Sequence, residues 1–190
     1  NNRTGSAASG GDWTLEVRAG AIETAVALDA VEQGAFAGAL DITTGLKGLW
    51  RLDADATDGS GNGYNGTLTN GALIDTTAGT NKVGAGKVSL DGVNDYVDLS
   101  AYRANFTGLT QGTISAWIKT SDANEPTIFE VSDIADGNSS AGLYLFNGTL
   151  NFYVAENGTV LLDVVSTVSI NDNVWHQVAA TVDATGNKLY

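Results

Sequence analysis

The most constraining feature of this sequence is the regular spacing of turn residues from Thr43 to the end of the chain. Short runs of alternating apolar and polar residues are separated by Gly, Asn or Asp at intervals of about ten residues, which indicates an all-β sandwich. The pairs Asn147-Gly148 and Asn157-Gly158 tolerate the positive φ angles that tight hairpin turns require. The 24 glycines and the single proline also favour hairpins over extended linkers.

The alternation predicts strands in six stretches of this region. These are residues 45–53, 86–100 (two strands around a DGVND turn), 112–120, 127–133, 141–166 and 173–183. The final residues, KLY, continue as a further strand. We therefore expect one β-domain over residues 44–190, built as a meander of short antiparallel strands.

The first 43 residues have a different texture. Residues 1–12 are small, polar and glycine-rich, which is typical of a flexible lead-in. Residues 13–19 alternate as a half-buried strand does. Residues 21–40 fit a helix or a second strand; Gly34 and Gly38 interrupt a helix, so a strand is favoured. We expect residues 1–43 to form a flexible lead and a β-like arm.

The charge balance excludes several kinds of partner. Among 190 residues, 9 Lys and Arg stand against 22 Asp and Glu, a formal net charge of −13. Nucleic acids and anionic membrane surfaces call for a basic face, so neither is expected as a partner. No stretch approaches the about 20 apolar residues of a membrane helix, so membrane insertion is not expected. Cysteine is absent, which excludes disulfides and thiolate catalysis.

Four motifs occur in a fixed order along residues 48–190. They are GLWRLD (48–53) with DGSGNGYNGT (58–67), GAGKVSLDGVNDYVDL (84–99), GTISAWIK (112–119) and VWHQVAATVDATGNKLY (174–190). This set resembles the laminin-G-like, concanavalin A-like lectin-glucanase jelly-roll domains of bacterial surface proteins. The resemblance implies an antiparallel two-sheet jelly-roll sandwich with residues 1–43 as a short N-terminal β appendage. Such domains continue past the KLY strand, so we expect a sandwich that is incomplete at its C-terminus, on the cell surface or outside the cell.

The loop after residue 57 is rich in oxygen ligands. Its side chains include Asp58, Ser60, Asn62 and Asn65, and calcium takes six to eight oxygens at flexible geometry. The resemblance implies that the side chains of Asp58 and Asn62 and the carbonyl of Gly63 hold calcium. It also implies that Asp53 or Asp95 approaches the ion. The alternative is a loop of Asx turns that needs no metal.

Catalysis is not expected. Glucanases that share the resemblance use an E-x-D-x-E strand, whose carboxylates act as nucleophile and acid, and none of the six glutamates lies in such a motif. The single histidine, His176, is expected to be structural.

Exposed aromatic rings can stack on sugars. The candidates are Tyr64, Tyr96, Tyr102, Trp117, Tyr144, Phe146 and Tyr153. Trp50, Trp117 and Trp175 are expected in the core, because each lies in a family strand motif. Tyr64 and Tyr102 lie in expected loops and are therefore the favoured ligand-binding residues.

Two hypotheses for the function stay open at this point. The first is a non-catalytic extracellular binding and adhesion module, stabilised by calcium, that engages a glycan or a surface protein. The second is a structural subunit of a surface layer or filament. In that case copies of the chain would assemble by strand addition through the N-terminal arm.

Overall fold

The computed structural model describes residues 45–106, 111–122, 124–133, 139–184 and 186–190, together with the backbone of residues 4–5 and 39–40. The chain divides into two compact units, Asn1–Leu46 and Lys47–Tyr190. In the first unit, β1 (Thr4–Gly5) pairs antiparallel with β2 (Ala39–Leu40). The predicted strand at 13–19, most of 21–40 and the expected boundary after residue 43 lie outside the described residues.

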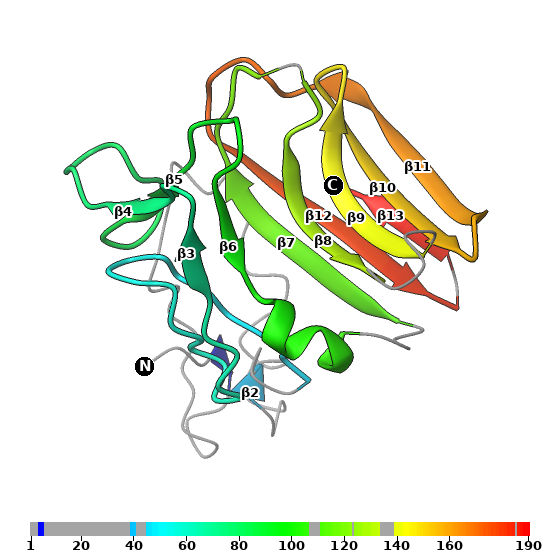
Figure 1. Cartoon of the computed structure of the whole chain (residues 1–190), viewed down its shortest axis with the longest axis horizontal. Coiled ribbons are helices and arrows are strands. Elements are labelled where there is room, and N and C mark those ends of the chain that lie inside the picture. Colours follow the sequence, from blue (N-terminus) through cyan, green and yellow to red (C-terminus); the bar gives the residue numbers. More distant parts are fainter. Residues whose placement is uncertain are drawn as a thin grey trace, which may run out of the picture. The chain divides into compact units, whose positions relative to one another are not determined.

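Two antiparallel sheets contain most of the strand residues of the second unit (Figure 1). The four-stranded sheet has the order β11-β10-β9-β8, with β8 (Thr127–Ser132), β9 (Ser140–Phe146), β10 (Thr149–Glu156) and β11 (Thr159–Ser169). The three-stranded sheet has the order β13-β12-β7, with β7 (Gly112–Ile118), β12 (His176–Asp183) and β13 (Gly186–Leu189).

Two short hairpin-like pairs precede these sheets in sequence. β3 (Thr67–Thr69) pairs with β6 (Tyr96–Asp98), and β4 (Leu73–Asp75) pairs with β5 (Lys87–Ser89). A 3-10 helix, η2 (Ser100–Asn105), follows β6. Within the described residues, no helix is both long and apolar enough to cross a bilayer.

The core lies between the two large sheets. Leu143, Leu145, Leu150 and Phe152 come from β9 and β10, and they pack with Val178 and Ala180 of β12. Ile114, Ala116 and Ile118 of β7 cover this cluster from the same sheet as β12. Because alternate residues of each strand enter one shared core, the predicted all-β, two-sheet antiparallel sandwich is confirmed.

The predicted hairpin turns are also confirmed. Asn147 and Gly148 connect β9 to β10 with φ angles of 49° and 82°. Asn157 and Gly158 connect β10 to β11 with φ angles of 49° and 74°. Two successive positive φ angles match the right-handed twist of the flanking strands, which explains why Asn-Gly occurs at both places.

One sequence-based expectation about strands is wrong. Residues 45–53 form no strand, and Trp50 makes only an isolated bridge to Asp58. The backbone N–H of Leu49 instead donates to a carboxylate oxygen of Asp58 at 2.9 Å, and Leu52 has a φ of 58°, which a strand does not allow.

Trp117 is not a core residue. Its neighbours Ala116 and Ile118 face the core, so Trp117 points to the other side of β7, where it is 38% exposed. The Lys82 ammonium lies 5.0 Å from its ring centroid. β3, β4 and η2 were not predicted as regular elements.

Candidate functional site

Asp58 organises the loop that the sequence singled out. Its Oδ1 accepts hydrogen bonds from the N–H groups of Leu49 (2.9 Å) and Ser60 (2.8 Å). Its Oδ2 accepts from the Ser60 hydroxyl (2.7 Å) and the Tyr64 N–H (3.0 Å). The Asp58 N–H donates in turn to Oδ1 of Asn65 at 2.9 Å. One carboxylate therefore connects the segment before the loop to both of its halves.

These hydrogen bonds lower the pKa of Asp58. Burial would raise the pKa of Asp58, which is only 8% exposed, but the hydrogen bonds from Leu49, Ser60 and Tyr64 outweigh burial and lower the pKa to about 2. The ionised form is the one that these donors stabilise.

Asp53 and Asp95 accept hydrogen bonds in other parts of the chain, whereas Asn62 is connected to Asp58 through the Ser60 hydroxyl. Asp53 Oδ1 accepts from the N–H groups of Ala85 (2.6 Å) and Gly86 (3.4 Å). Asp95 Oδ2 accepts from the Asp91 N–H (3.0 Å), inside the turn between β5 and β6. Asn62 Nδ2 donates to the Lys47 carbonyl (3.1 Å) and the Ser60 hydroxyl (3.2 Å). Gly63 has a φ of 76°.

These contacts do not fit a ready calcium cradle. An ionised carboxylate has about four lone-pair positions, and all four on Asp58 are taken by N–H and O–H donors. Across the described parts of the chain, no three Asp, Glu or His side chains are grouped closely enough to hold a metal ion, so Asp53, Asp58 and Asp95 do not meet. Calcium binding at this loop stays a prediction.

Tyr64 and Tyr102, the favoured ligand-binding residues, are brought together by the fold. Their ring centroids lie 5.1 Å apart, and both rings are half-buried. Tyr64 also packs edge-on against Phe106 at 5.8 Å, and Phe106 contacts Phe129 of β8 at 6.0 Å. The pair therefore belongs to an aromatic cluster that fastens η2 to the sandwich, and its role in ligand binding stays a prediction.

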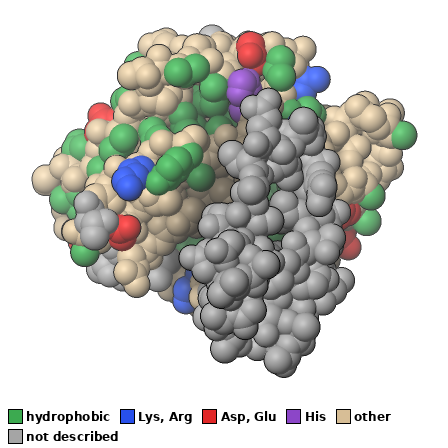
Figure 2. Space-filling model, turned by 180° about the vertical axis from the view of Figure 1, so that it is seen from behind, with side chains coloured by type: hydrophobic (Ala, Val, Ile, Leu, Met, Phe, Trp, Pro, Cys, Tyr) green, Lys and Arg blue, Asp and Glu red, His purple; other side chains and the backbone are tan. Residues whose placement is uncertain are grey.

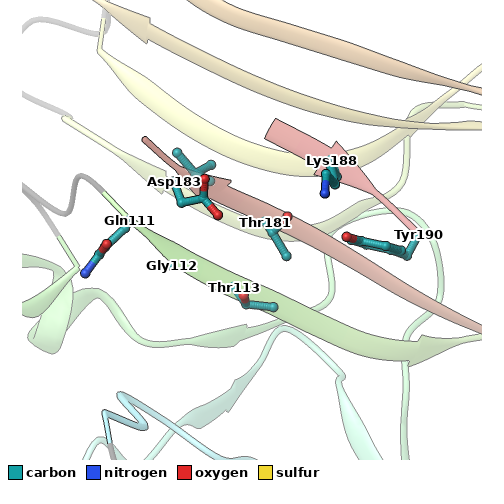
Figure 3. A pocket seen from close by; sticks show the side chains of 8 residues that line it. Gln111, Gly112, Thr113, Thr181, Asp183, Lys188 and Tyr190 are labelled. Carbon is teal, nitrogen blue, oxygen red and sulfur yellow. The ribbon is translucent and has the colours of Figure 1, made fainter. Parts of the chain in front are cut away.

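One depression lies on the outer face of the three-stranded sheet (Figure 3). Its volume is about 450 Å³, and its lining includes Thr113, Thr181 and Lys188, which are register partners on β7, β12 and β13. Tyr190 provides the single aromatic ring of this lining, and Figure 3 shows it to the right of Thr181 and Lys188. Figure 2, which shows the molecule from behind, has hydrophobic side chains scattered over the described surface rather than gathered in one large patch.

A second depression, of about 200 Å³, lies on the four-stranded sheet, on the side facing away from the core. We call it the tyrosine depression. It is lined by Glu125, Thr127, Glu130, Ser140, Gly142, Tyr144 and Tyr153. It presents two tyrosine rings, both half-buried, so it offers a better aromatic platform than the first depression.

The register of the strands explains how these side chains meet. Glu130, Gly142, Tyr153 and Asp163 are consecutive partners across β8, β9, β10 and β11. Directly opposed residues point to the same side of a sheet, so this row shares one face. The next row holds Thr127, Tyr144, Asn151 and Val165. Because Gly142 has no side chain, it leaves space between the two tyrosines.

A bulge in β8 completes the lining. Thr127 pairs with Tyr144 and Phe129 pairs with Leu143, so Ile128 is an extra residue between them. In a regular strand Thr127 and Phe129 would share one side. The extra residue lets Phe129 face inward beside Leu143, while Thr127 and Glu130 both join Tyr144 on the outer face.

Asn151 is the buried polar residue on this face. It is 5% exposed, and its Nδ2 donates to Oδ1 of Asp163 at 3.2 Å. Its Oδ1 is buried and has no hydrogen-bond partner. Since a carboxylate can only accept, the amide must turn its nitrogen to Asp163, and this leaves the Asn151 oxygen as an unused acceptor.

The environment of Tyr144 is acidic as well as buried. Burial raises the pKa of Tyr144 above its usual value, and the negative charges of Asp163 and Glu125 raise it further. The sequence had placed Tyr144 and Tyr153 among seven aromatic candidates, but not Asn151, Asp163, Glu125 or Glu130. The one sequence feature that could have indicated this site is Asn151, a polar residue inside the apolar run of β10.

His176 has a carboxylate partner that was not anticipated. Its Nε2 lies 2.9 Å from Oδ1 of Asp172, four residues earlier. This hydrogen bond lowers the pKa of Asp172. The pair joins the start of β12 to the preceding loop, which is a structural role.

Two antiparallel sheets enclose one core, and long loops precede them in the sequence. This architecture defines the class of concanavalin A-like sandwiches. Residues 91–190, more than half of the chain, match the concanavalin A-like lectin/glucanases superfamily, and the chain belongs to this laminin-G-like family. Residues 1–40 match a different family, described as a domain of unknown function (DUF4347).

Other comparisons add one similar structure. It is the 2.1 Å crystal structure of an S-layer domain-containing protein (residues 221–444) from Clostridium thermocellum. The two share 23% sequence identity with a TM-score of 0.49, over 75% of this chain and 67% of that chain. No curated protein matches this chain.

Proposed function

We propose that this chain is a non-catalytic binding module of the cell surface that engages a glycan through the tyrosine depression. One observation carries the proposal: Tyr144 and Tyr153 flank a recess floored by Gly142. Asn151, the register partner of Tyr144 on the same face, adds a buried side-chain oxygen without a partner next to these residues.

Sugars have the chemistry that such a recess accepts. A pyranose presents an apolar face that packs on an aromatic ring, and hydroxyl groups around its edge that donate hydrogen bonds. The carboxylates of Glu125 and Glu130 and the hydroxyls of Thr127 and Ser140 surround the rings and can accept from these groups. A few convergent polar groups around an aromatic surface are typical of small-ligand sites.

The absence of catalysis and the location are parts of the same proposal. Family membership supports a binding role, and the formal net charge of −13 favours neither nucleic acid nor an anionic membrane as the partner. The resemblance to surface-protein domains supports a location outside the cell. Calcium is not used in this proposal, because the oxygens of Asp58 are already occupied.

Binding of the full chain to an immobilised glycan panel tests the proposal. We expect at least one neutral or amine-bearing oligosaccharide to bind, and Tyr153→Ala to weaken that binding about tenfold, the effect of losing roughly 1.4 kcal/mol. Gly142→Val should block the recess; a Cβ at position 142 meets its nearest atoms at 3.7 Å or more, so there is room for this first carbon. Trp117→Ala, an exposed aromatic residue on the other sheet, is the matched control.

Three results would contradict the proposal. The first is that no glycan binds. The second is binding that survives both Tyr153→Ala and Gly142→Val. The third is cleavage of the bound oligosaccharide, measured by chromatography after overnight incubation, which would show an enzyme in place of a binding module.

Assembly of copies into a surface layer or filament is the second candidate function. The observation that favours it is β11, which lies at one edge of its sheet among the described strands and exposes Leu161 (60%), Val165 (49%) and Val168 (64%). Such an edge can accept another strand. Light scattering after size exclusion tests this candidate. Leu161→Lys should reduce any oligomer to monomer, whereas a monomer at every concentration excludes assembly through β11.

A further inference from the structure

The tyrosine depression is lined by acceptors and negative charge. Of its seven lining residues, Glu125 and Glu130 are carboxylates and none is Lys or Arg. Asp163 stands beside it, as the register partner of Tyr153 on β11. Three carboxylates therefore surround two tyrosine rings without a cationic side chain in the lining.

The neighbouring polar group does not offset this charge. Asn151 donates a hydrogen bond to Asp163, and its oxygen adds a further acceptor. The carboxylates also act on Tyr144, where the charges of Asp163 and Glu125 add to burial in disfavouring the phenolate. The charged side chains of the lining, and Asp163 beside it, are therefore all negative.

Aromatic faces add to the attraction for a cation. The π-face of tyrosine is the negative side of its quadrupole, and an ammonium group over it is attracted to this face. A carboxylate near the same ammonium adds Coulomb attraction, whereas an anionic ligand would meet repulsion from three carboxylates. The ligand group that complements this lining is therefore one that carries a positive charge and donates hydrogen bonds.

On the basis of the proposed glycan-binding function, we propose that the tyrosine depression selects sugars that carry a free ammonium group, as deacetylated hexosamines do, and rejects sugars that carry carboxylates or sulfates. The observations favour a sugar over a lysine side chain for two reasons. Two rings and the hydroxyls of Thr127 and Ser140 offer more contacts than one ammonium on an alkyl stem uses. The volume of about 200 Å³ is smaller than a drug-sized site and suits one sugar unit.

Calorimetry of the full chain with three short probes tests this selectivity. The probes are the trimers of glucosamine, N-acetylglucosamine and galacturonate, at pH 6, where the amine of the first is protonated. We expect the glucosamine trimer to bind at least about tenfold more tightly than its N-acetylated counterpart, and the galacturonate trimer not to bind. Raising the salt concentration should weaken the first interaction, because ion pairs near a surface are screened.

Variants separate this site from the general acidity of the chain. Glu130→Gln should reduce the preference for the free amine by at least about threefold. Glu156→Gln removes the same charge from the exposed end of β10, outside the lining, and should leave the preference unchanged. Equal effects of the two variants would mean that only the net charge is sensed, and would overturn the inference.

The remaining outcomes distinguish the inference from the function on which it rests. If the N-acetylated or acidic trimer binds as tightly as the amine, and Tyr153→Ala abolishes that binding, the selectivity is wrong while glycan binding stands. If no glycan binds, the proposed function fails as well. If a lysine-rich peptide binds in a Glu130-dependent manner and no sugar does, the depression is a peptide site and the inference is overturned.

Discussion

At the scale of single residues, Asp58 shows how one side chain can hold a loop of glycines in place. A loop with so little side-chain packing has high conformational entropy to lose, and four hydrogen bonds to one buried carboxylate offset part of that loss. Hydrogen bonds to a charged group contribute about 1.5–3 kcal/mol each in favourable cases. The loop therefore depends on the charge of Asp58.

The pH dependence of stability should report this charge. The folded pKa of Asp58, about 2, lies below the usual aspartate pKa of 3.8, so its stabilisation is complete above pH 3.8 and is lost as the pH falls through 2. The shift corresponds to roughly 2 kcal/mol. Asp58→Asn should remove about this amount in urea unfolding at pH 7 and flatten the acid limb between pH 4 and 2. Asp55→Asn is the control, since Asp55 is exposed and accepts hydrogen bonds from Thr57 alone.

Chelation is the direct test of calcium at the same loop. The sequence predicts that calcium stabilises the fold, whereas the saturated oxygens of Asp58 predict no effect. We expect the melting temperature to be the same in EDTA and in 5 mM calcium, within the error of a thermal scan. A melting temperature that is higher in calcium than in EDTA, with no such difference in Asp58→Ala, would contradict this expectation. It would show that an ion displaces the N–H donors from Asp58.

At the scale of elements, the two Asn-Gly turns offer a matched comparison. Both Gly148 and Gly158 have positive φ angles, 82° and 74°. A Cβ at Gly148 would lie 2.5 Å from Oδ1 of Asn171, while a Cβ at Gly158 meets nothing within 4 Å. Gly158→Ala should therefore cost only the backbone strain, about 1–2 kcal/mol, and Gly148→Ala should cost more. Denaturant titration measures both; equal losses would contradict the packing at Gly148.

The elements also show which parts of the fold the sequence can specify. The hairpins from β9 to β11 were predictable because alternation and Asn-Gly turns are local signals. The strand predicted over residues 45–53 is wrong because the Leu49 N–H donates to the Asp58 side chain instead of to another strand. The alternation of neighbouring residues contains no information on this contact. Trp117 was misplaced by motif resemblance, although the alternation of Ile114, Ala116 and Ile118 already points it outward.

The candidate site was less predictable than the fold. Tyr144 and Tyr153 could be named as aromatic candidates, but their neighbours depend on register across four strands. Asp163 reaches Asn151 only because β11 pairs with β10 as it does. Single-residue shifts in pairing move whole sets of side chains to the other face, so a site made of four strands cannot be read from any one of them.

At the scale of the whole second unit, stability rests on one shared core. Leu145 is fully buried between the sheets. Leu145→Ala should destabilise the unit by about 3–5 kcal/mol, the range for a leucine truncation that leaves a cavity. The transition should stay cooperative with an unchanged m value, because both sheets lose their contacts together. Loss of one sheet before the other, seen as two transitions, would contradict a single core.

The extra residue in β8 also affects what such a sandwich can evolve to bind. A regular strand over the same residues would turn Thr127 inward and place Ile128 on the outer face, although its composition would be unchanged. Specificity on this sheet is thus set partly by the position of the bulge. Moving such an irregularity by a few positions exchanges the groups offered to a ligand while the hydrophobic interior keeps its leucines.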